Sequence, residues 1–475
     1  MTLLTELKHK QILVLGAGIT GLSCSRYLNT HQLCFAVNDS RTKPFADDYS
    51  EQKFDDDFPN AKLYLGQWQS DLIANADVIL ISPGIDSSIK EIAPYISEDC
   101  LVMGDVELFC LLNNELAKPI KLLALTGSNG KSTVVSMLAY LAECLKVKAQ
   151  LGGNIGQPVL DIFTEASFES EIQTNDLPDF VILELSSFQL ETLTSMEAIA
   201  TSVLNISDDH LDRHQTMENY IQVKHAIYPQ GKLAIINRDD KATFTANETQ
   251  PVISFGSDIP TENNFGIILH NEKSHLAFGK QPLIAIDKLP LAGMHNALNY
   301  LAALAFGHSA GWSTTAMVDN LAGFTGLAHR CQRVDSQDNI VWINDSKATN
   351  IGATIAAING LAQTLAAQGK NKQRLILIAG GDGKGADFSQ LKEPLDKHVH
   401  QLITLGKDGS QIAELLANSN NVTSLDEAVI VAKANANAGD IVLLSPACAS
   451  IDMFKNFSER GEHFVSAVNR LTETN

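Results

Sequence analysis

The sequence has 475 residues, of which 45% are hydrophobic and 19% are charged, as expected for a globular protein with extensive cores. Its 35 Lys and Arg are outnumbered by 55 Asp and Glu, and the net charge of −20 argues against binding to nucleic acid through phosphates. The seven scattered cysteines include no CxxC pair, so neither a disulfide framework nor a zinc site is indicated. No secretory leader or long apolar stretch is visible, so we expect a cytoplasmic chain of about three domains without membrane insertion.

The first predicted element is a buried strand, Ile12–Leu15, which runs into Gly16-Ala17-Gly18-Ile19-Thr20-Gly21 and then a helical pattern. A second strand, Phe35–Asn38, ends just before Asp39, about twenty residues after the glycines. This arrangement is typical of a nucleotide site, because the glycines let a phosphate approach the N-terminus of the helix. The motif alone leaves open NAD, another nucleotide diphosphate, or a tight turn without a ligand. A third strand is predicted at Val78–Ile81.

The next strand, Leu122–Leu125, leads into Thr126-Gly127-Ser128-Asn129-Gly130-Lys131-Ser132-Thr133 and a helix. Gly130-Lys131-Ser132 is the end of a P-loop, in which backbone N–H groups surround the phosphates of ATP. Lys131 would reach the β- and γ-phosphates, and the Ser132 hydroxyl would ligate Mg²⁺. A strict Walker A motif has glycine where Leu125 stands. We still predict an ATP site, because strand, loop and helix follow in the required order.

Acidic and histidine side chains follow two further strands. Glu184 ends the predicted strand Val181–Glu184. The predicted strand Ser202–Ile206 is followed by Asp208, Asp209 and His210. Because the carboxyl ends of parallel strands meet at the ligand side of a sheet, we predict metal or phosphate contacts here. Lys224 lies on the helix that follows, and from its own sequence context it would be a solvated surface lysine. The acidic stretch Glu165–Asp179 is predicted to be a surface loop.

The C-terminal third repeats the pattern of strand and glycine-rich turn at Leu375–Ala379 and Gly380-Gly381-Asp382-Gly383. Polar clusters interrupt otherwise apolar surroundings at Asn344–Asn350, Gly383-Lys384 and Ser445–Ser450. Their Lys, Thr and Ser donors suit a small zwitterion with two carboxylates. Ser450 is not a predicted hydrolase nucleophile, because no GxSxG elbow surrounds it.

Helical patterns separate most of the strands, which predicts an α/β protein with parallel sheets and right-handed crossovers. The remaining predicted strands are Leu233–Asn237, Leu402–Leu405 and Ile441–Leu444. We predict three domains: an N-terminal Rossmann-like domain over residues 1–111, a central P-loop ATPase-like mononucleotide-binding domain over 112–326, and a C-terminal Rossmann-like domain over 327–475.

These residues together resemble the Mur ligase family over essentially the whole chain. Gly127-Ser128-Asn129-Gly130-Lys131-Ser132-Thr133 is similar to the ATP loop of that family, including the absent first glycine. Asn344–Asn350 and Ser445–Gly461 resemble the branch that adds D-glutamate to UDP-N-acetylmuramoyl-L-alanine. The resemblance implies an ATP- and Mg²⁺-dependent ligase of cytoplasmic peptidoglycan precursor synthesis, acting through an acyl-phosphate and releasing ADP and phosphate. The N-terminal glycine motif would then bind UDP and not NAD, and a monomer is expected.

The resemblance also implies a role for each matching position. The UDP-linked substrate would contact Ile19, Thr20, Asp39, Ser40, Arg41, Ser82, Pro83, Gly84, Asn154, Ser186, Gln189 and His210. ATP would contact Gly127, Ser128, Asn129, Gly130, Lys131, Ser132, Thr133, Asn296, Asn299, Arg330 and Asp345. D-glutamate would contact Thr349, Lys384, Ser450 and Phe457. A pair of Mg²⁺ ions would be held by Ser132, Glu184, His210 and Lys224, the last as a carbamate formed with CO₂. Catalysis would use Lys131, His210, Lys224 and Lys347.

Three alternatives compete with this interpretation. An NAD-dependent oxidoreductase would use the N-terminal glycine motif but would leave the P-loop unexplained. A non-catalytic nucleotide-binding module would have no need of intact Lys131, Ser132 and Glu184. A related ligase for another amino acid is opposed by the two C-terminal signatures, and only through the resemblance.

Overall fold

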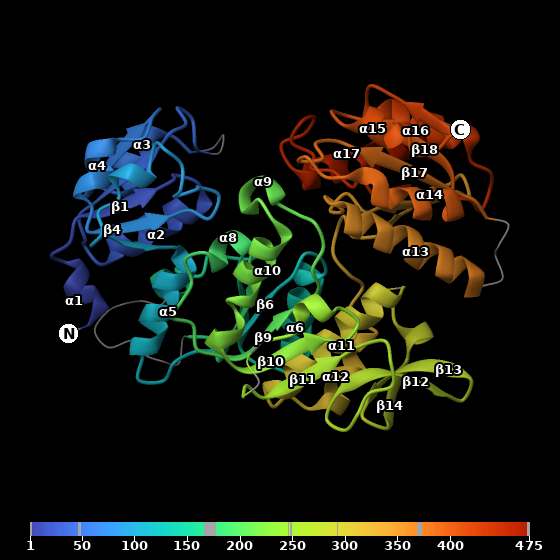
Figure 1. Ribbon diagram of the computed structural model, residues 1–475, viewed down its shortest axis with the longest axis horizontal. Helices are drawn as coiled ribbons and strands as arrows, with labels where there is room; N and C mark the ends of the chain where they lie inside the picture. The colour runs from blue at the N-terminus through green and yellow to red at the C-terminus, as the bar shows by residue number, and fades with distance from the viewer. Residues whose placement is uncertain are drawn as a thin grey trace.

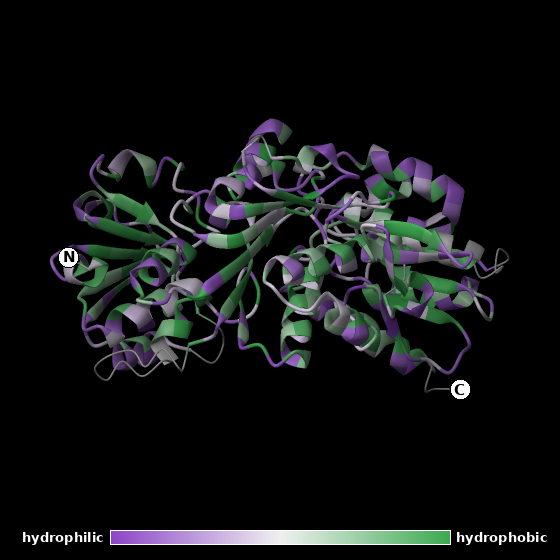
Figure 2. Cartoon of the chain, turned by 90° about the horizontal axis from the view of Figure 1, so that it is seen from below, coloured by the Kyte–Doolittle hydropathy of each residue, from purple (hydrophilic) through white to green (hydrophobic). Residues whose placement is uncertain are grey.

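The computed structural model describes residues 2–45, 49–165, 177–245, 247, 249–291, 293–367 and 373–472. Within these ranges the main sheets form an N-terminal, a central and a C-terminal unit, and the central unit lies between the other two (Figure 1). Hydrophobic residues concentrate on the strands, and hydrophilic residues mark the outer helices (Figure 2). Most of the predicted surface loop at Glu165–Asp179, residues 166–176, lies outside the described residues.

The N-terminal unit is a parallel sheet with the strand order β3-β2-β1-β4-β5. Its strands are β1 (Ile12–Leu15), β2 (Phe35–Asp39), β3 (Ala61–Leu65), β4 (Val78–Ile81) and β5 (Leu101–Met103). Its helices are α1 (Leu3–Leu7), α2 (Ile19–Thr30), α3 (Glu51–Asp57), α4 (Ser70–Asn75) and α5 (Asp105–Glu115), with a 3-10 turn at Ala93–Tyr95. Strands β1 and β4 are buried along their whole length, which explains their uninterrupted apolar sequences.

The central unit is a second parallel sheet, with the strand order β11-β10-β9-β6-β8-β7. Its strands are β6 (Lys121–Thr126), β7 (Ala149–Gly153), β8 (Phe180–Glu184), β9 (Ala198–Val203), β10 (Gly231–Asn237) and β11 (Val252–Phe255). Its helices are α6 (Lys131–Cys144), α7 (Asp161–Glu165), α8 (Ser187–Leu190), α9 (Leu211–His214) and α10 (Met217–His225), with 3-10 turns at Tyr228–Gln230 and Lys241–Thr243. Strand β6 pairs with β8 on one side and β9 on the other, so the carboxyl ends of these strands meet beside the P-loop.

A small antiparallel sheet follows the central sheet and was not predicted from the sequence. Its strands are β12 (Phe265–His270), β13 (Lys273–Phe278) and β14 (Gln281–Ala285), followed by a 3-10 turn at Ile286–Lys288. Two helices complete the central unit, α11 (Met294–Ser309) and α12 (Thr314–Leu321). Helix α11 packs against α6 and buries Tyr300, Leu301, Leu304 and Phe306 in the core.

The C-terminal unit has the strand order β15-β16-β20-β17-β18-β19. Strand β15 pairs with β16 in the antiparallel sense, and the other pairs are parallel. The strands are β15 (Gln332–Val334), β16 (Val341–Asn344), β17 (Leu375–Gly380), β18 (Val399–Leu405), β19 (Ser419–Asn421) and β20 (Ile441–Leu444). The helices are α13 (Ile351–Ala367), α14 (Lys392–His398), α15 (Gly409–Ala413), α16 (Leu425–Asn435) and α17 (Phe457–Thr472), with a 3-10 turn at Phe388–Leu391.

The strands predicted from continuous apolar runs are all present, and the predicted α/β class is confirmed. The strand predicted at Ser202–Ile206 was wrong in its bounds, because β9 spans Ala198–Val203. The residues after β9 contact the P-loop: the backbone N–H of Ser128 donates to the Asn205 carbonyl at 2.9 Å. The domain boundary predicted near residue 112 falls within α5, and both predicted boundaries stay predictions.

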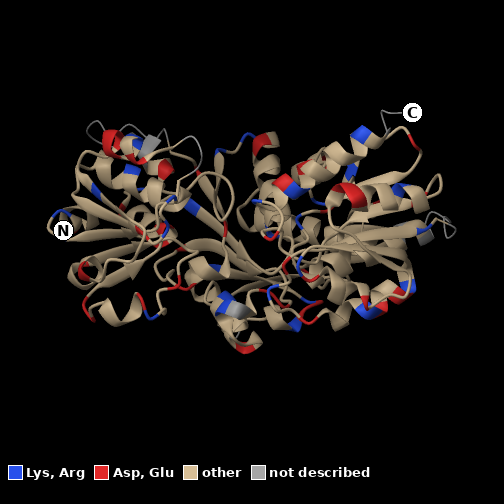
Figure 3. Ribbon diagram, turned by 90° about the horizontal axis from the view of Figure 1, so that it is seen from above, with Lys and Arg blue, Asp and Glu red and all other residues tan. Residues whose placement is uncertain are grey.

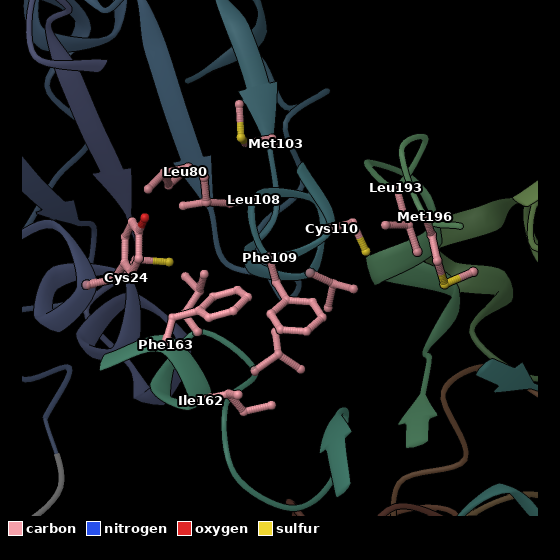
Figure 4. Close-up of a cluster of buried hydrophobic side chains, with 14 of the residues drawn as sticks. Cys24, Leu80, Met103, Leu108, Phe109, Cys110, Ile162, Phe163, Leu193 and Met196 are labelled. Atoms are coloured by element: carbon pink, nitrogen blue, oxygen red, sulfur yellow. The ribbon is translucent and has the colours of Figure 1, made fainter. Parts of the chain in front are cut away.

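A continuous hydrophobic core joins the N-terminal unit to the central unit (Figure 4). At its centre the rings of Phe109 on α5 and Phe163 on α7 stack with 5.0 Å between centroids. Polar contacts cross the same interface, because Asp161 accepts hydrogen bonds from Arg26 Nη2 at 2.6 Å and from Ser23 Oγ at 2.9 Å. The C-terminal unit has its own core clusters, which share no residue with this one.

Acidic and basic residues are interspersed over all three units (Figure 3). Among the helices of the described ranges, none combines the length and the apolar character needed to span a bilayer.

Candidate active site

The P-loop connects β6 to α6, and two glycines set its shape. Gly127 and Gly130 have φ values of +149° and +80°, and a Cβ on Gly130 would lie 2.5 Å from Asn299 Oδ1. Lys131 Nζ folds back over the loop and donates to the carbonyls of Gly127 at 2.7 Å and Ser128 at 3.0 Å. The loop and the N-terminus of α6 together present a surface that suits an anionic ligand.

A cavity of 250 Å³, here named the P-loop cavity, lies at the carboxyl ends of β6 and β8. It is lined by Ser128, Asn129, Gly130, Lys131, Ser132, Asn154, Glu184, Ser186, Ser187, Phe188, Asp209, His210, Tyr220, Lys224, Arg330, Lys347, Thr349 and Asn350. The structure therefore brings together all the expected metal ligands, which are Ser132, Glu184, His210 and Lys224.

Glu184 ends β8 and is the buried carboxylate of the P-loop cavity. Its Oε1 accepts a hydrogen bond from Asn154 Nδ2 at 3.0 Å, whereas Oε2 has no partner among the described residues. A buried carboxylate oxygen without a partner is costly, and a hard divalent cation such as Mg²⁺ would offset that cost. In the described part of the chain no three or more His, Cys, Asp or Glu form a metal-binding group. A metal here would therefore also need Ser132 and a modified Lys224.

Lys224 corrects the expectation of a solvated surface lysine. Its side chain on α10 is only 2% exposed, and Nζ donates to the Gly127 carbonyl at 3.1 Å and to Thr126 Oγ1 at 3.3 Å. Burial, reinforced by the positive charge of Lys131, lowers the pKa of Lys224 well below its usual value. A lysine that gives up its proton readily is a competent nucleophile, so the position suits carbamate formation with CO₂.

Cationic side chains from different units gather around the P-loop cavity: Lys131, Arg330, Lys347 and Lys384. Burial and repulsion from Arg330 lower the pKa of Lys347 to about 8. Burial also lowers the pKa of Lys131, although the charges of Glu184 and Asp209 oppose that change. A polyphosphate would neutralise this cluster and offset the cost of its burial.

Several side-chain contacts link the segment after α12 and the C-terminal unit to the central unit, and two of them involve the expected site residues Arg330 and Lys384. Arg330 Nη2 donates to Ser132 Oγ at 2.7 Å, so an expected ATP contact touches the P-loop directly. Lys384 Nζ pairs with Asp209 Oδ1 at 3.3 Å. Nearby Lys charges, Lys384 first, outweigh the effect of burial and lower the pKa of Asp209. The C-terminal unit therefore contacts the edge of the P-loop cavity in this structure.

A second cavity, the α11 cavity, has a volume of 330 Å³ and lies between α11 and α13. The expected ATP contacts that line it are Asn129, Gly130, Thr133, Asn296, Asn299, Arg330 and Asp345. Ser128, Lys131 and Ser132 line the P-loop cavity instead, and Gly127 lines neither. The two cavities share Asn129, Gly130, Arg330 and Lys347. Burial raises the pKa of Asp345 to about 6.

A third cavity, the β1 cavity, has a volume of 770 Å³ and lies beyond the carboxyl ends of β1, β2 and β4. The expected UDP-substrate positions that line it are Ile19, Thr20, Asp39, Ser40, Arg41, Ser82, Pro83, Gly84, Asn154 and Gln189. Ser186 and His210 line the P-loop cavity instead. Asp39 accepts from the Ala17 backbone at 2.9 Å and from Arg41 Nη2 at 2.7 Å. Burial alone would raise the pKa of Asp39, but these hydrogen bonds lower it.

The expected amino-acid positions are only partly brought together. Thr349 lines the P-loop cavity, and Lys384 reaches its edge through Asp209. Ser450 is 3% exposed and does not line that cavity. Phe457 does not line it either, but its ring lies 3.8 Å from Lys347 Nζ. Of the four expected contacts, Ser450 and Phe457 therefore lie outside the lining of the P-loop cavity.

Arg460 is a structural residue of this region that the sequence did not reveal. It lies on α17, is 3% exposed, and its Nη2 donates to the carbonyls of Ser346 at 2.8 Å and Cys448 at 3.1 Å. It therefore ties the segment after β16 to the segment after β20, which are both polar clusters of the predicted amino-acid site. An arginine among charged helix residues usually faces solvent, so no sequence signal distinguished it.

Known families match each of the three units. The Mur ligase MurD-like N-terminal domain matches residues 10–104, the Mur ligase middle domain residues 125–307, and the Mur ligase glutamate ligase domain residues 329–448. The UDP-N-acetylmuramoylalanine–D-glutamate ligase of Colwellia psychrerythraea is 59% identical over 468 residues, covering 98% of each chain. The ligase of the same name from Legionella pneumophila is 40% identical over 471 residues, covering 98% of this chain and 100% of that protein.

This chain belongs to the Mur ligase family. Solved Mur ligases share its fold at low sequence identity, which confirms the predicted three-part α/β architecture. The MurC ligase of Thermotoga maritima has a TM-score of 0.60 at 16% identity, covering 98% of this chain and 100% of that one. The MurF ligase of Acinetobacter baumannii has a TM-score of 0.60 at 18% identity, covering 97% and 93%. The glycine motif after β1 thus belongs to a Mur ligase, not to an NAD-dependent oxidoreductase.

Proposed function

We propose that this Mur ligase joins D-glutamate to UDP-N-acetylmuramoyl-L-alanine in peptidoglycan precursor synthesis, with conversion of ATP to ADP and phosphate. Its relatives in Colwellia and Legionella are named for this reaction. The observation that carries the proposal is the order of the three cavities. The P-loop cavity shares Asn154 with the β1 cavity, and Asn129 and Lys347 with the α11 cavity. Two large ligands can therefore approach one reaction site from opposite sides.

ATP is proposed to occupy the α11 cavity with its phosphates at the P-loop. The MurF ligase of Thermotoga maritima, solved in complex with ADP, shares the fold at a TM-score of 0.60 and 15% identity, covering 94% of this chain and 97% of that one. Lys131, folded over the P-loop, would move to the β- and γ-phosphates. Arg330, which donates to Ser132 Oγ here, would donate to the phosphates of ATP instead, because the phosphates compete with Ser132 for the guanidinium group.

The metal site is proposed at Ser132, Glu184, His210 and carbamylated Lys224. Mg²⁺ bound there would neutralise charge on the phosphoryl oxygens during transfer. Carbamylation converts the buried Lys224 into an anion, which interacts favourably with the positive charge of Lys131. The orphaned Glu184 Oε2 and the lowered pKa of Lys224 support this assignment.

The proposed chemistry proceeds in two steps. The alanine carboxylate of the UDP-linked substrate attacks the γ-phosphorus of ATP, the bond to the β–γ bridging oxygen breaks and ADP leaves, while Lys131 and Lys347 stabilise the charge on the transferred group. The amine of D-glutamate then attacks the acyl carbon of the acyl-phosphate, and phosphate leaves. D-glutamate is proposed to bind Thr349, Lys384, Ser450 and the backbone of Phe457. Because Lys384 is paired with Asp209, a substrate carboxylate would have to share or replace that partner.

The UDP part of the substrate is proposed to occupy the β1 cavity, with its diphosphate at the N-terminus of α2. The two domain boundaries, the monomeric state and the cytoplasmic location remain predictions from the sequence.

The experiment that tests the proposal measures phosphate release from ATP with UDP-N-acetylmuramoyl-L-alanine and a panel of amino acids that includes both glutamate enantiomers. Release that depends on D-glutamate is the expected result. Release with a different amino acid would keep the ligase reaction and contradict the assigned amino-acid site. Absence of release with every amino acid would contradict the proposal as a whole.

A further inference from the structure

Asp105 has no role in the reaction outlined above, yet its environment is unusual. It is the first residue of α5, where the N-terminal unit passes into the central unit, and it is 3% exposed. Its Oδ1 has no hydrogen-bond partner among the described residues, and neither has the buried Oγ of Ser82 after β4. An acidic residue in the first helical turn interacts favourably with the helix dipole, but this interaction gives Oδ1 no hydrogen-bond partner. Buried polar atoms without partners cost stability unless a ligand supplies the missing hydrogen bonds.

Asp105 and Ser82 border a small space, here named the side cavity, with a volume of 60 Å³. The side cavity and the large β1 cavity share Ser82, Pro83, Ile85, Asp105 and Gln189, so the small space adjoins the large one. Its lining combines the polar Ser82 and Asp105 with the apolar Val106 and Phe188. At about 10–15 Å³ for each water-sized group, the side cavity holds roughly four to six such groups.

The position of the side cavity indicates which part of the substrate lies beside it. The diphosphate belongs at the N-terminus of α2, and the reacting carboxylate belongs at the P-loop cavity, which Asn154 connects to the β1 cavity. The amino sugar must span the distance between them. It therefore passes Ser82, Asp105 and Gln189, which border both the side cavity and the β1 cavity.

We propose, on the basis of the proposed function, that the side cavity binds the acetamido group of the UDP-linked amino sugar. The acetamido N–H donates to Asp105 Oδ1, its carbonyl oxygen accepts from Ser82 Oγ, and its methyl group contacts Val106 or Phe188. The group has four heavy atoms, one donor and one acceptor, and it satisfies both orphaned atoms at once. Burial raises the pKa of Asp105 to about 6, so its carboxyl group is still largely ionised at neutral pH and accepts the N–H bond.

Calorimetric titration of the full-length protein tests this assignment with UDP, UDP-glucose and UDP-N-acetylglucosamine. The two sugars differ only at carbon 2, where one has a hydroxyl and the other an acetamido group. We expect the wild-type protein to bind the acetamido ligand about tenfold more tightly than UDP-glucose, as one hydrogen bond to a charged group would give. In Asp105→Leu, which keeps a branched side chain without an acceptor, that preference falls to about twofold while the affinity for UDP is unchanged. Asp105→Asn, which retains a neutral acceptor, gives an intermediate preference and provides the test if the leucine variant does not fold.

Asp39→Asn is the matched control, because Asp39 holds the other end of the β1 cavity through Ala17 and Arg41. It should weaken all three ligands alike and keep the acetamido preference. The inference is overturned if the Asp105 variants keep the full preference, or if they weaken UDP, UDP-glucose and UDP-N-acetylglucosamine equally, as a purely structural residue would. Wild-type binding of UDP without any acetamido preference overturns the inference and leaves the proposed function intact. No binding of UDP at all overturns both.

Discussion

Replacing Lys347 with methionine is predicted to stabilise the ligand-free protein and to remove most of its activity. Lys347 lies among Arg330, Lys131 and Lys384, and burial with this repulsion lowers its pKa from 10.5 to about 8. That change corresponds to about 3 kcal/mol of lost stability at neutral pH. The cation–π contact between Lys347 Nζ and the Phe457 ring, whose centroid is 3.8 Å away, offsets about 1 kcal/mol of that loss. Methionine has a side chain of similar length without the charge, so we expect a net gain of about 2 kcal/mol in the free energy of unfolding.

The pH dependence provides the stricter part of this test. A lysine whose pKa is lower in the folded protein carries its full penalty below pH 8, and the penalty disappears as the pH rises toward 10.5. The advantage of Lys347→Met should therefore be largest at pH 7 and should shrink at more alkaline pH. Thermal unfolding without nucleotide should show a rise of about 4–8 °C at pH 7. Turnover should fall by roughly 100-fold, because a charge that stabilises phosphoryl transfer is lost.

Lys397 on α14 is a suitable control, because its side chain is exposed and pairs with Glu393 one turn away. Lys397→Met should change the stability by less than about 0.5 kcal/mol and leave turnover unchanged. A Lys347→Met protein that unfolds at a lower temperature than the wild type at pH 7 would refute the reasoning. A stability difference that grows with pH would refute it as well.

Three further predictions concern the proposed reaction. Lys131→Ala should keep the folded structure but lower turnover by roughly 100- to 1,000-fold, because a donor to the phosphates is removed; a wild-type rate of phosphate release would contradict the P-loop assignment. Lys224→Ala should be inactive and should regain part of its activity with short-chain carboxylic acids, which replace the carbamate; full wild-type activity in CO₂-free buffer would count against carbamylation. Ser450→Ala should raise the KM for D-glutamate by about tenfold and leave the KM for ATP nearly unchanged. The opposite pattern in steady-state kinetics would move the amino-acid pocket away from Ser450.

The sequence predicted the central strands of the sheets well and the edge strands poorly. Strands such as β4 and β8 are buried along their length, so their sequences are continuous apolar runs. Edge strands such as β3 and β19 are partly exposed, and their mixed sequences resemble loops. The antiparallel strands β12 to β14 were missed for a similar reason, because each buries only part of its length.

The candidate site was predictable wherever a short motif fixes the local geometry. The P-loop and the strand end at Glu184 belong to this group, because a buried strand determines where the next residue lies. The burial of Lys224 was not predicted, because a lysine at helical spacing from Met217, Tyr220 and Ile221 on α10 usually extends its charged end to solvent. The contact of Lys384 with Asp209 joins residues 175 positions apart, so it depends on how two units pack. Local sequence does not encode such packing.

The shared core around Phe109 and Phe163 has a consequence for exchanging parts between related enzymes. The N-terminal unit is not an independent module, because separating it from the central unit would expose the apolar side chains of α5 on one side and of α7 on the other to water. A chimera that takes this unit from another Mur ligase must therefore also take the matching surface of the central unit. The C-terminal unit has separate core clusters and contacts its neighbour largely through polar pairs such as Lys384 with Asp209. Exchange of the C-terminal unit, which carries the proposed amino-acid site, is consequently better tolerated by the architecture, so that site can change while the proposed nucleotide-sugar site is retained.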